Sequence, residues 1–393
     1  MIADFEETFS GRLPQLHNID TSSVALGVAL RDKSGDSGTS QLRIVQAPLA
    51  EGVVVLNGTH EFRLRASRII LNSGSLASNA LIGSAPASGG FVASPTTELS
   101  SGFEPYLSYR HQNWLSTFAG IGITPTGGVL PSEPVGNLGI SQQFARGNWY
   151  AQLFSRLVRE SILSYTGIVD PFTGRRWGRV RRSGLEFGGY TALGERWGAS
   201  GKLQIAYLGG ESVASNSSMS LSVGLGRDLK WSGFDYFTVG PEFSYDHFNR
   251  NLSHFTFGQG GYFSPQSLVS LGIAANFLTE EARQFIIKGR LSLGLSQKRE
   301  DASPCFPLGA LLPPTPFCQT GFAANNSTDI NFSMELLAVR RLSDHLQVGG
   351  AIAFCESPGF NDRAAMVFMR YSFGARKVTM SSDLPEGIFQ SLY

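Results

Sequence analysis

Few residues of the types that carry out chemistry stand at the spacings that chemistry requires. Gly35-Asp36-Ser37-Gly38 matches the surroundings of a serine nucleophile, but such a serine needs a histidine base and a buried aspartate that orients the base. His17 lies in the segment before the first predicted strand. Ser253 and His254 are adjacent in sequence, so on any strand they point to opposite faces. A polar hairpin turn accounts for the first motif.

The histidines and glycine-rich stretches do not indicate a metal or cofactor site either. None of the six histidines forms an i, i+4 pair or clusters with a cysteine, and ligand spacing is what makes a metal signal specific. Gly258-Gln259-Gly260-Gly261 is glycine-rich but has no strand–helix unit around it, which phosphate-binding loops require. The sequence predicts no catalytic residue, no metal, no cofactor and no enzymatic activity.

One segment, Asn251–Pro265, stands out by its aromatic content. Four aromatic residues lie there among glycines: Phe255, Phe257, Tyr262 and Phe263. They fit an aromatic girdle at a membrane interface. They fit equally well a constriction or gate whose flat rings let a sugar stack. The residues alone leave both readings open.

Three cysteines are too few for a disulfide framework. Cys305 and Cys318 share one proline-rich loop, which permits a single local disulfide in an oxidising compartment. Cys355 falls on a predicted strand.

Alternation of apolar and polar residues is the dominant pattern of the chain. In Met219–Leu225 every second residue is apolar, and the same holds from Ile287 to Leu295 and from Ile330 to Ala338. Side chains on a strand alternate between faces, so each segment has one apolar and one polar face. Sixteen such segments are predicted, at 22–31, 39–47, 60–69, 98–110, 113–122, 135–145, 148–158, 182–193, 197–208, 217–229, 234–248, 264–278, 283–299, 325–341, 345–356 and 362–373.

The connections alternate between long loops and short turns. Segments such as Leu71–Thr97, Arg159–Arg181 and Glu300–Ala324 are long, whereas the next connection in each case is tight. This combination is typical of an all-β, transmembrane antiparallel β-barrel of about sixteen strands. One connection, Pro48–Thr59, breaks the rule, and its Val53–Leu56 run is expected to extend the third strand.

The same alternation sets the expected organisation and topology. Residues 1–21 are predicted to be a periplasmic linker, residues 22–373 the outer-membrane barrel and residues 374–393 a periplasmic C-terminal tail. Both termini are therefore expected in the periplasm of a bacterial cell, with the long loops outside. The N-terminus lacks the charged and apolar regions of a secretory signal, so a mature, truncated or longer form is expected.

Composition agrees with a barrel and excludes other classes. Charged residues make up 16% of the chain and the net charge is +1, which offers no footprint for nucleic acid. Glycine is abundant, at 46 of 393 residues, and in strands such an excess needs a reason such as bulges or close packing. No apolar run is long enough for a transmembrane helix.

Three stretches resemble a known family. Asn251–Pro265, Arg31–Leu42 and Ser161–Gly178 are similar to the C-terminal barrel domain of cellulose synthase operon protein C. The resemblance runs from about Val24 to Phe373 and implies a sixteen-stranded outer-membrane barrel through which β-1,4-glucan leaves the cell. It also implies a periplasmic tetratricopeptide-repeat segment, or a separate protein of that kind, and an inner-membrane cellulose synthase as partners. Residues 1–21 cannot hold one 34-residue repeat.

The expected function is therefore export of a neutral polysaccharide, with cellulose as the substrate and Phe255, Phe257, Tyr262 and Phe263 as its contacts. Outer-membrane lipids and lipopolysaccharide are further expected partners, the latter through the cluster Arg175, Arg176, Arg179, Arg181 and Arg182. Two alternatives come from other classes: a plugged structural or adhesin barrel, and an outer-membrane hydrolase.

Overall fold

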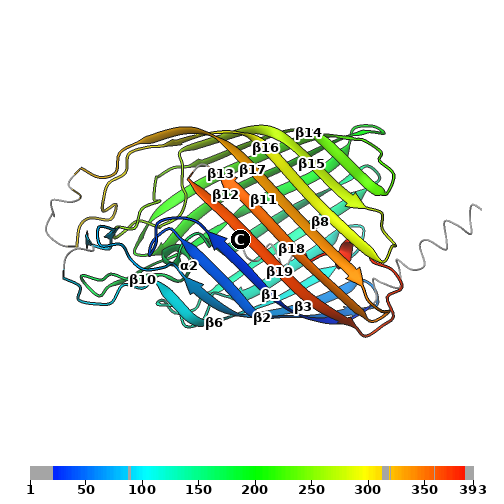
Figure 1. Ribbon diagram of the computed structural model, residues 1–393, viewed down its shortest axis with the longest axis horizontal. Coiled ribbons are helices and arrows are strands. Elements are labelled where there is room, and N and C mark those ends of the chain that lie inside the picture. The colour runs from blue at the N-terminus through cyan, green and yellow to red at the C-terminus, as the bar shows by residue number, and fades with distance from the viewer. Residues whose placement is uncertain (1–20, 87–89, 312–317, 319, 358, 386–393) are drawn as a thin grey trace, which may run out of the picture.

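A closed cylinder of tilted strands forms the molecule (Figure 1). The computed structural model describes residues 21–86, 90–311, 318, 320–357 and 359–385. Within these residues sixteen strands form the wall. They are β1 (Ser23–Lys33), β2 (Leu42–Leu56), β3 (His60–Asn72), β6 (Glu98–His111), β7 (Ser116–Ile123), β8 (Pro134–Phe144), β9 (Gly147–Leu157), β11 (Arg176–Ala192), β12 (Trp197–Glu211), β13 (Val213–Asp228), β14 (Phe234–Phe248), β15 (Ser267–Thr279), β16 (Phe285–Glu300), β17 (Asn325–Arg341), β18 (Leu346–Ser357) and β19 (Phe360–Ser372).

The wall closes through its first and last strands. β1 pairs antiparallel with β19 along its whole length, from Ser23 opposite Ser372 to Lys33 opposite Asp362. Every other wall strand pairs antiparallel with its neighbours in sequence order. A closed ring of strands leaves no free backbone edge, so the predicted fold class is confirmed.

The two faces of the wall differ as the alternation predicts. On β1, Leu26 and Val28 point outward and are exposed, whereas Ala25, Ala29 and Arg31 point inward and are buried. On β19, Val367, Met369 and Tyr371 are likewise exposed. The outer face is apolar around the ring and the inner face is mostly polar. Among the described residues, no helix is long and apolar enough to cross a membrane.

All sixteen predicted segments coincide with wall strands, but some bounds differ: β11 begins at Arg176, inside the predicted loop Arg159–Arg181, and β2 continues to Leu56. Val53–Leu56 belongs to β2 and not to the third strand. β2 runs past Pro48 because the register shifts between Gln46 and Leu49, which makes a bulge where a proline is tolerated. The turn that follows is Asn57-Gly58, and both residues have positive φ, which a tight hairpin turn of this type requires.

One part of the wall is paired over a shorter length than the rest. β7 has eight residues, and β6 pairs with it only from Tyr106 to His111. Beyond that point the segment after β7 covers the edge of β6, where the backbone N–H of Thr126 donates to the carbonyl of Phe103 at 3.0 Å. By contrast, β16 pairs with β17 along its full length.

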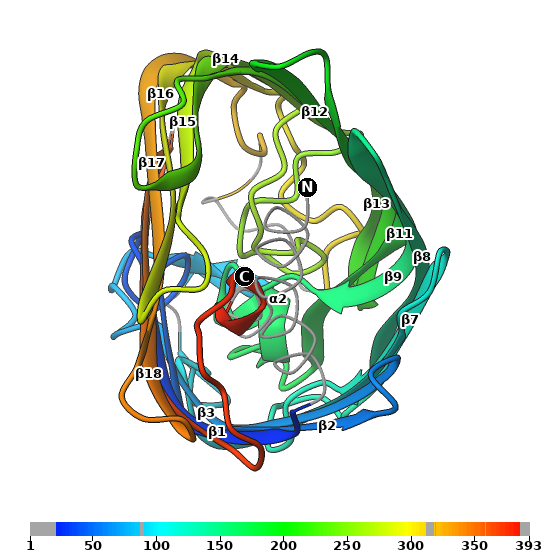
Figure 2. The same ribbon diagram turned by 90° about the vertical axis from the view of Figure 1, so that its right-hand side faces the viewer.

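The remaining elements lie in the loops and the tail. The helix α2 (Ile162–Thr166) and the short strands β4 (Leu81–Ile82), β5 (Ala85–Pro86) and β10 (Ile168–Val169) belong to long loops at one end of the barrel. A single helical turn, η1 (Ser381–Asp383), follows the last wall strand. Viewed along the barrel, α2 and the helical turn η1 (red) both lie inside the ring (Figure 2).

Much of the glycine excess has a steric reason. Several aromatic rings lie flat over a glycine on the neighbouring strand, where any Cβ would meet the ring. A Cβ on Gly349, for example, would lie 2.6 Å from two ring atoms of Phe368 and 2.7 Å from the carbonyl oxygen of Ala338. The same arrangement pairs Tyr106 with Gly120 and Gly122, Phe118 with Gly139, Tyr150 with Gly188, Tyr190 with Gly198 and Phe277 with Gly289.

We expect Gly349→Val to lower the free energy of unfolding by about 1–3 kcal/mol, because the added side chain overpacks against Phe368. Gly201→Val is the matched control, since a Cβ there would meet only the carbonyl oxygen of Ser222, at 3.8 Å. Its effect should stay within about 0.5 kcal/mol. Urea unfolding in detergent measures both variants, and equal stability of the two would contradict the steric account.

Candidate export lumen

The loop 249–266 does not extend away from the barrel but fills its interior. Leu252, Phe257 and Tyr262 are at most 3% exposed. They belong to an apolar cluster with residues of α2 and of the walls β11, β13 and β14. We call this cluster, with the loops that build it, the plug.

The four predicted substrate contacts all lie in the plug. Phe257 packs on Trp177 with ring centroids 5.4 Å apart, and Tyr262 packs on Phe248. Phe255 packs against the same cluster, and Phe263 meets Phe360 edge-on at 5.7 Å. Apolar side chains of several loops bury Phe257 and Tyr262, whereas Phe255 and Phe263 are partly buried. Their role in binding a saccharide stays a prediction.

The helix α2 is fastened to this loop by two polar contacts. Ser161 caps the helix, accepting a hydrogen bond from the backbone N–H of Ser164, and its hydroxyl also donates to the carbonyl of Gly261 at 2.6 Å. The carboxylate of Glu160 accepts the backbone N–H of Phe263 at 2.7 Å. We call these two contacts the clasp. They join loops that are about one hundred residues apart in the chain.

Two further loops complete the plug. Gly83 exchanges backbone hydrogen bonds with Phe255 and Phe257, both at 2.9 Å, and Ser84 bonds the buried carboxylate of Asp170. From the other side, the Gln259 amide donates to the carbonyl of Pro304 at 2.8 Å. These contacts make one interlocked body from loops that lie between different strand pairs.

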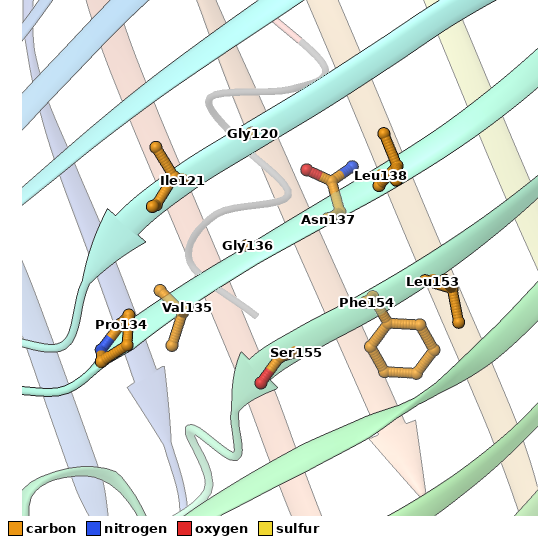
Figure 3. A pocket seen from close by; sticks show the side chains of 10 residues that line it. All are labelled: Gly120, Ile121, Pro134, Val135, Gly136, Asn137, Leu138, Leu153, Phe154 and Ser155. Carbon is orange, nitrogen blue, oxygen red and sulfur yellow. The ribbon is translucent and has the colours of Figure 1, made fainter.

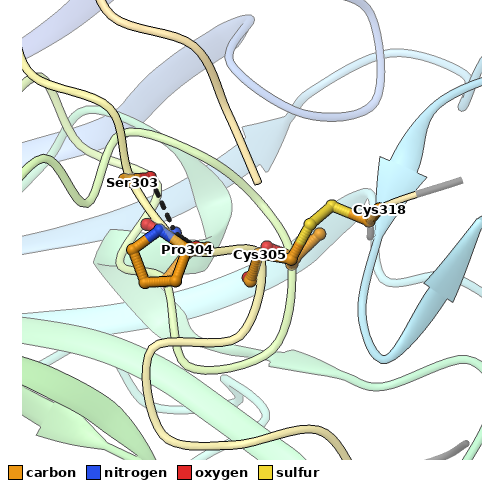
Figure 4. The surroundings of a disulfide bond; sticks show 6 residues. Ser303, Pro304, Cys305 and Cys318 are labelled. Carbon is orange, nitrogen blue, oxygen red and sulfur yellow. Dashed lines mark hydrogen bonds between the residues drawn. A yellow bond between two sulfur atoms is a disulfide. The ribbon is translucent and has the colours of Figure 1, made fainter. Parts of the chain in front are cut away.

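The predicted disulfide is present in this region. Cys305 is bonded to Cys318 (Figure 4), and their Cα atoms are 5.9 Å apart. Thr256 donates a hydrogen bond to the carbonyl of Cys305, which ties the cross-linked loop to the plug. Cys355 has a free thiol.

A cavity of about 610 Å³ lies inside the ring, between Arg159 at the loop end of the wall and the described part of the tail. Its wall comes from β3, β6, β7, β8 and β9, and its other side comes from Ser381, Ser382 and Leu384 of the tail. Charged residues line it in pairs. Arg63 bonds Glu51 and Glu61, at 3.3 and 2.9 Å, and Arg159 bonds Glu104 at 2.6 Å. Sequence reasoning did not single out these residues, although the alternation of β3 places Arg63 on the inner face.

The described part of the tail, up to residue 385, folds back into the ring (Figure 2). Asp383 is 1% exposed and forms an ion pair with Arg376. Gln347 of β18 donates to the same carboxylate at 3.1 Å, and Arg370 of β19 donates to the Asp383 carbonyl at 2.8 Å. Leu384 packs in a core cluster with inward residues of the closing strands.

The opposite wall, from β13 to β17, is rich in hydroxyl groups. The hydroxyls of Ser270 and Ser296 are 2.6 Å apart, and those of Ser292 and Ser333 are 2.8 Å apart. Asn331 donates to Ser296 at 2.6 Å. Arg290, whose charge needs a partner in a neutral lumen, forms an ion pair with Glu242.

Most of the predicted lipopolysaccharide cluster is engaged within the protein. Arg179 and Arg181 pair with Glu133. Arg175 lies over the ring of Phe257 and Arg182 over that of Phe248. Arg175, Arg176 and Arg181 are nevertheless exposed, and contact with lipopolysaccharide stays a prediction.

A second hollow, of about 430 Å³, lies in the wall across β7, β8 and β9 (Figure 3). Gly120 and Gly136 leave room there, and Ile121, Leu138 and Leu153 line it. These three side chains are more than half exposed and face outward. The hollow therefore belongs to the outer surface and not to the lumen.

Comparison with known proteins identifies the family. Residues 40–374 match the family described as cellulose synthase operon protein C C-terminus. The chain belongs to this family. It is 27% identical to the cellulose synthase operon protein C of Pseudomonas fluorescens over 95% of its own length, and 27% identical to that of Xanthomonas axonopodis pv. citri over 64%. It spans only 28% and 18% of the length of these two relatives.

A solved structure shares the fold. The chain superposes on a bacterial polysaccharide outer membrane secretin with a TM-score of 0.53, at 10% identity, over 90% of this chain and 99% of that one. The fold of this member of the cellulose synthase operon protein C family is thus that of an outer-membrane β-barrel.

The packing of His254 in the plug is expected to depend on pH. Its ring stacks on Phe322 with centroids 3.4 Å apart, and burial lowers the pKa of His254 to about 4, with the carboxylate of Glu300 opposing that shift. The folded plug therefore holds the neutral ring. Stability of the loop 249–266 should be fully present above pH 6.5, the usual pKa, and should fall as the pH drops towards 4.

Hydrogen exchange of the loop 249–266, corrected for the intrinsic pH dependence of exchange, measures this effect. We expect faster exchange at pH 5 than at pH 7 in the native protein. His254→Phe is the control, because it retains a ring on Phe322 and cannot take up a proton. Equal protection of the native loop at both pH values would contradict the assignment.

Proposed function

We propose that this barrel exports a neutral polysaccharide, most specifically a β-1,4-glucan such as cellulose, and that it acts as a conduit and not as an enzyme. The observation that carries the proposal is the inner wall. Within the described residues it combines hydroxyl and amide groups with charges that largely face opposite charges. A neutral polyol forms exchangeable hydrogen bonds with such a surface, whereas unpaired fixed charges hold an ionic polymer.

The distribution of charge supports this assignment. Arg31 bonds Asp362 at 2.5 Å with both side chains about 5% exposed, and Arg63, Arg159 and Arg290 each face a carboxylate. A buried charge is costly unless it is paired. Pairing within the wall neutralises these charges, and the hydroxyl and amide groups from β13 to β17 add uncharged hydrogen-bonding partners.

We place the barrel in the bacterial outer membrane, with the short turns in the periplasm and the plug towards the outside. Long loops gather at one end and short turns at the other, and in bacterial barrels the short turns are periplasmic. Trp114, Trp197 and Trp231 are exposed near the short turns, as aromatic residues are at membrane interfaces. Both termini of the barrel domain would then face the periplasm, where a tetratricopeptide-repeat segment or protein could connect it to an inner-membrane cellulose synthase.

A plugged structural barrel is the second candidate, and the plug itself favours it. The two candidates differ in whether the plug moves. If the barrel is a conduit, weakening the clasp should open the lumen. If the plug is permanent, the same change should leave the lumen closed.

We expect the double variant Glu160→Ala/Ser161→Ala to raise the mean conductance of the barrel in planar bilayers. It removes a helix cap, worth about 1 kcal/mol, and the hydrogen bond to Phe263. Glu98→Ala/Ser100→Ala, which changes the same residue types at the exposed end of β6, is the control and should conduct like the native protein. If the Glu160→Ala/Ser161→Ala variant inserts correctly but has the same mean conductance as the control, the result would favour the structural barrel.

Deletion of the gene should abolish release of glucan from cells while synthesis continues, because the polymer has no other route through the outer membrane. Glucose released from the culture medium by a β-1,4-glucanase measures secretion, and the native gene should restore it. Undiminished secretion by the deletion strain would contradict the proposed function.

A further inference from the structure

Aromatic rings cover one sector of the inner wall in a regular way. From β6 to β12, an inward aromatic residue on one strand repeatedly lies over a glycine on the next strand. The four residues are Tyr106, Phe118, Tyr150 and Tyr190, and we call them the aromatic wall. The sequence shows the inward positions of these residues through its alternation, but not the glycines that lie opposite them.

The glycines hold these rings flat. A Cβ on Gly122 would lie 2.6 Å from the ring of Tyr106, and a Cβ on Gly188 would lie 2.6 and 2.7 Å from two ring atoms of Tyr150. Gly188 and Gly198 are buried, because the rings of Tyr150 and Tyr190 cover them. A ring that lies along the wall presents its face, and not its edge, to the lumen.

Hydrogen-bonding groups accompany the rings at the same level of the wall. Tyr106 donates to the amide oxygen of Asn137 at 2.6 Å, and the Asn137 amide donates to Gln152 at 3.1 Å. Glu186 accepts hydrogen bonds from Tyr150 at 3.0 Å and from Gln152 at 2.9 Å. Flat apolar faces beside amides and carboxylates suit a pyranose ring, which has an apolar C–H face and a rim of hydroxyls.

The rings are also accessible. Phe118 and Tyr106 line the cavity below the plug, and Tyr190 is 44% exposed. The guanidinium of Arg65 lies over Tyr106, 5.4 Å from the ring centroid, so that ring is partly covered. Phe118, Tyr150 and Tyr190 are therefore the better platforms. By contrast, Phe257 and Tyr262 of the plug are almost fully buried.

We propose that the aromatic wall is a saccharide-binding site, and that it takes the apolar faces of consecutive β-linked glucose units as the polymer enters the lumen. The proposal rests on the proposed export function and names where the polymer is held. Flat stacking fixes distance but not orientation along the wall, so bound sugar units can slide from one ring to the next. The wall therefore guides the chain without stopping it.

Binding of cellohexaose to the purified full chain in detergent, followed by calorimetry, tests this site. The triple variant Phe118→Leu/Tyr150→Leu/Tyr190→Leu covers the same glycines with aliphatic side chains but lacks flat faces. We expect it to bind cellohexaose at least about tenfold more weakly than the native protein. Phe187→Leu, which changes an exposed ring on the outer face of the wall, is the control and should bind normally.

Reduced migration on a gel before heating, which reports a closed barrel, shows whether each variant is folded. If the triple variant does not fold, the single variant Phe118→Leu takes its place. We expect that variant to bind cellohexaose more weakly than the native protein. Native affinity in a folded triple variant, or no cellohexaose binding by the native protein, would overturn the proposal. Failure of the proposed export function can be told apart from failure of the aromatic wall as a binding site, because glucan secretion would then continue in the deletion strain.

Discussion

Closure of the backbone hydrogen-bond network is the constraint on which the rest of this structure depends. A strand inside hydrocarbon has no water to satisfy its N–H and C=O groups, so each needs a neighbour on both sides. The pairing of β1 with β19 meets that need for the first and last strands and so closes the ring. Once the ring is closed, every strand must present one face to lipid and one to the interior, and the alternation of the sequence follows from that requirement.

A closed wall of this size leaves an interior that side chains from the strands do not fill. Long loops fill one end of it, and the tail fills part of the other. The contacts that hold these segments are of two kinds. Apolar packing around Trp177 and Phe257 gives the plug its bulk, while ion pairs such as Arg31 with Asp362 fix the charged layer beneath it. The interior is thus built like the core of a soluble protein, in separate bodies that meet the wall at both apolar and polar contacts.

The wall could be predicted from the sequence because its signal is local. A period of two over ten or more residues is visible in any one strand without reference to distant segments. Pro48 misled the prediction, since a bulge lets β2 continue past a residue that ends most strands. The interior could not be predicted in this way. The bond from Ser84 to Asp170 joins residues 86 positions apart, and nothing in either loop alone shows that they meet. The aromatic content of 249–266 was visible, but its burial depends on α2 and on the loop before β6. The rings of the inner wall were visible as well, but their glycine partners require the strand register.

The short pairing between β6 and β7 has a mechanical consequence. A cylinder under lateral pressure deforms where the fewest bonds resist shear, and here the wall is joined only from Tyr106 to His111. Above that section a loop, and not a strand, covers the edge of β6. The barrel is therefore stiff around most of its circumference and compliant along one line. Changes in bilayer thickness or curvature would widen or narrow its cross-section at that line first.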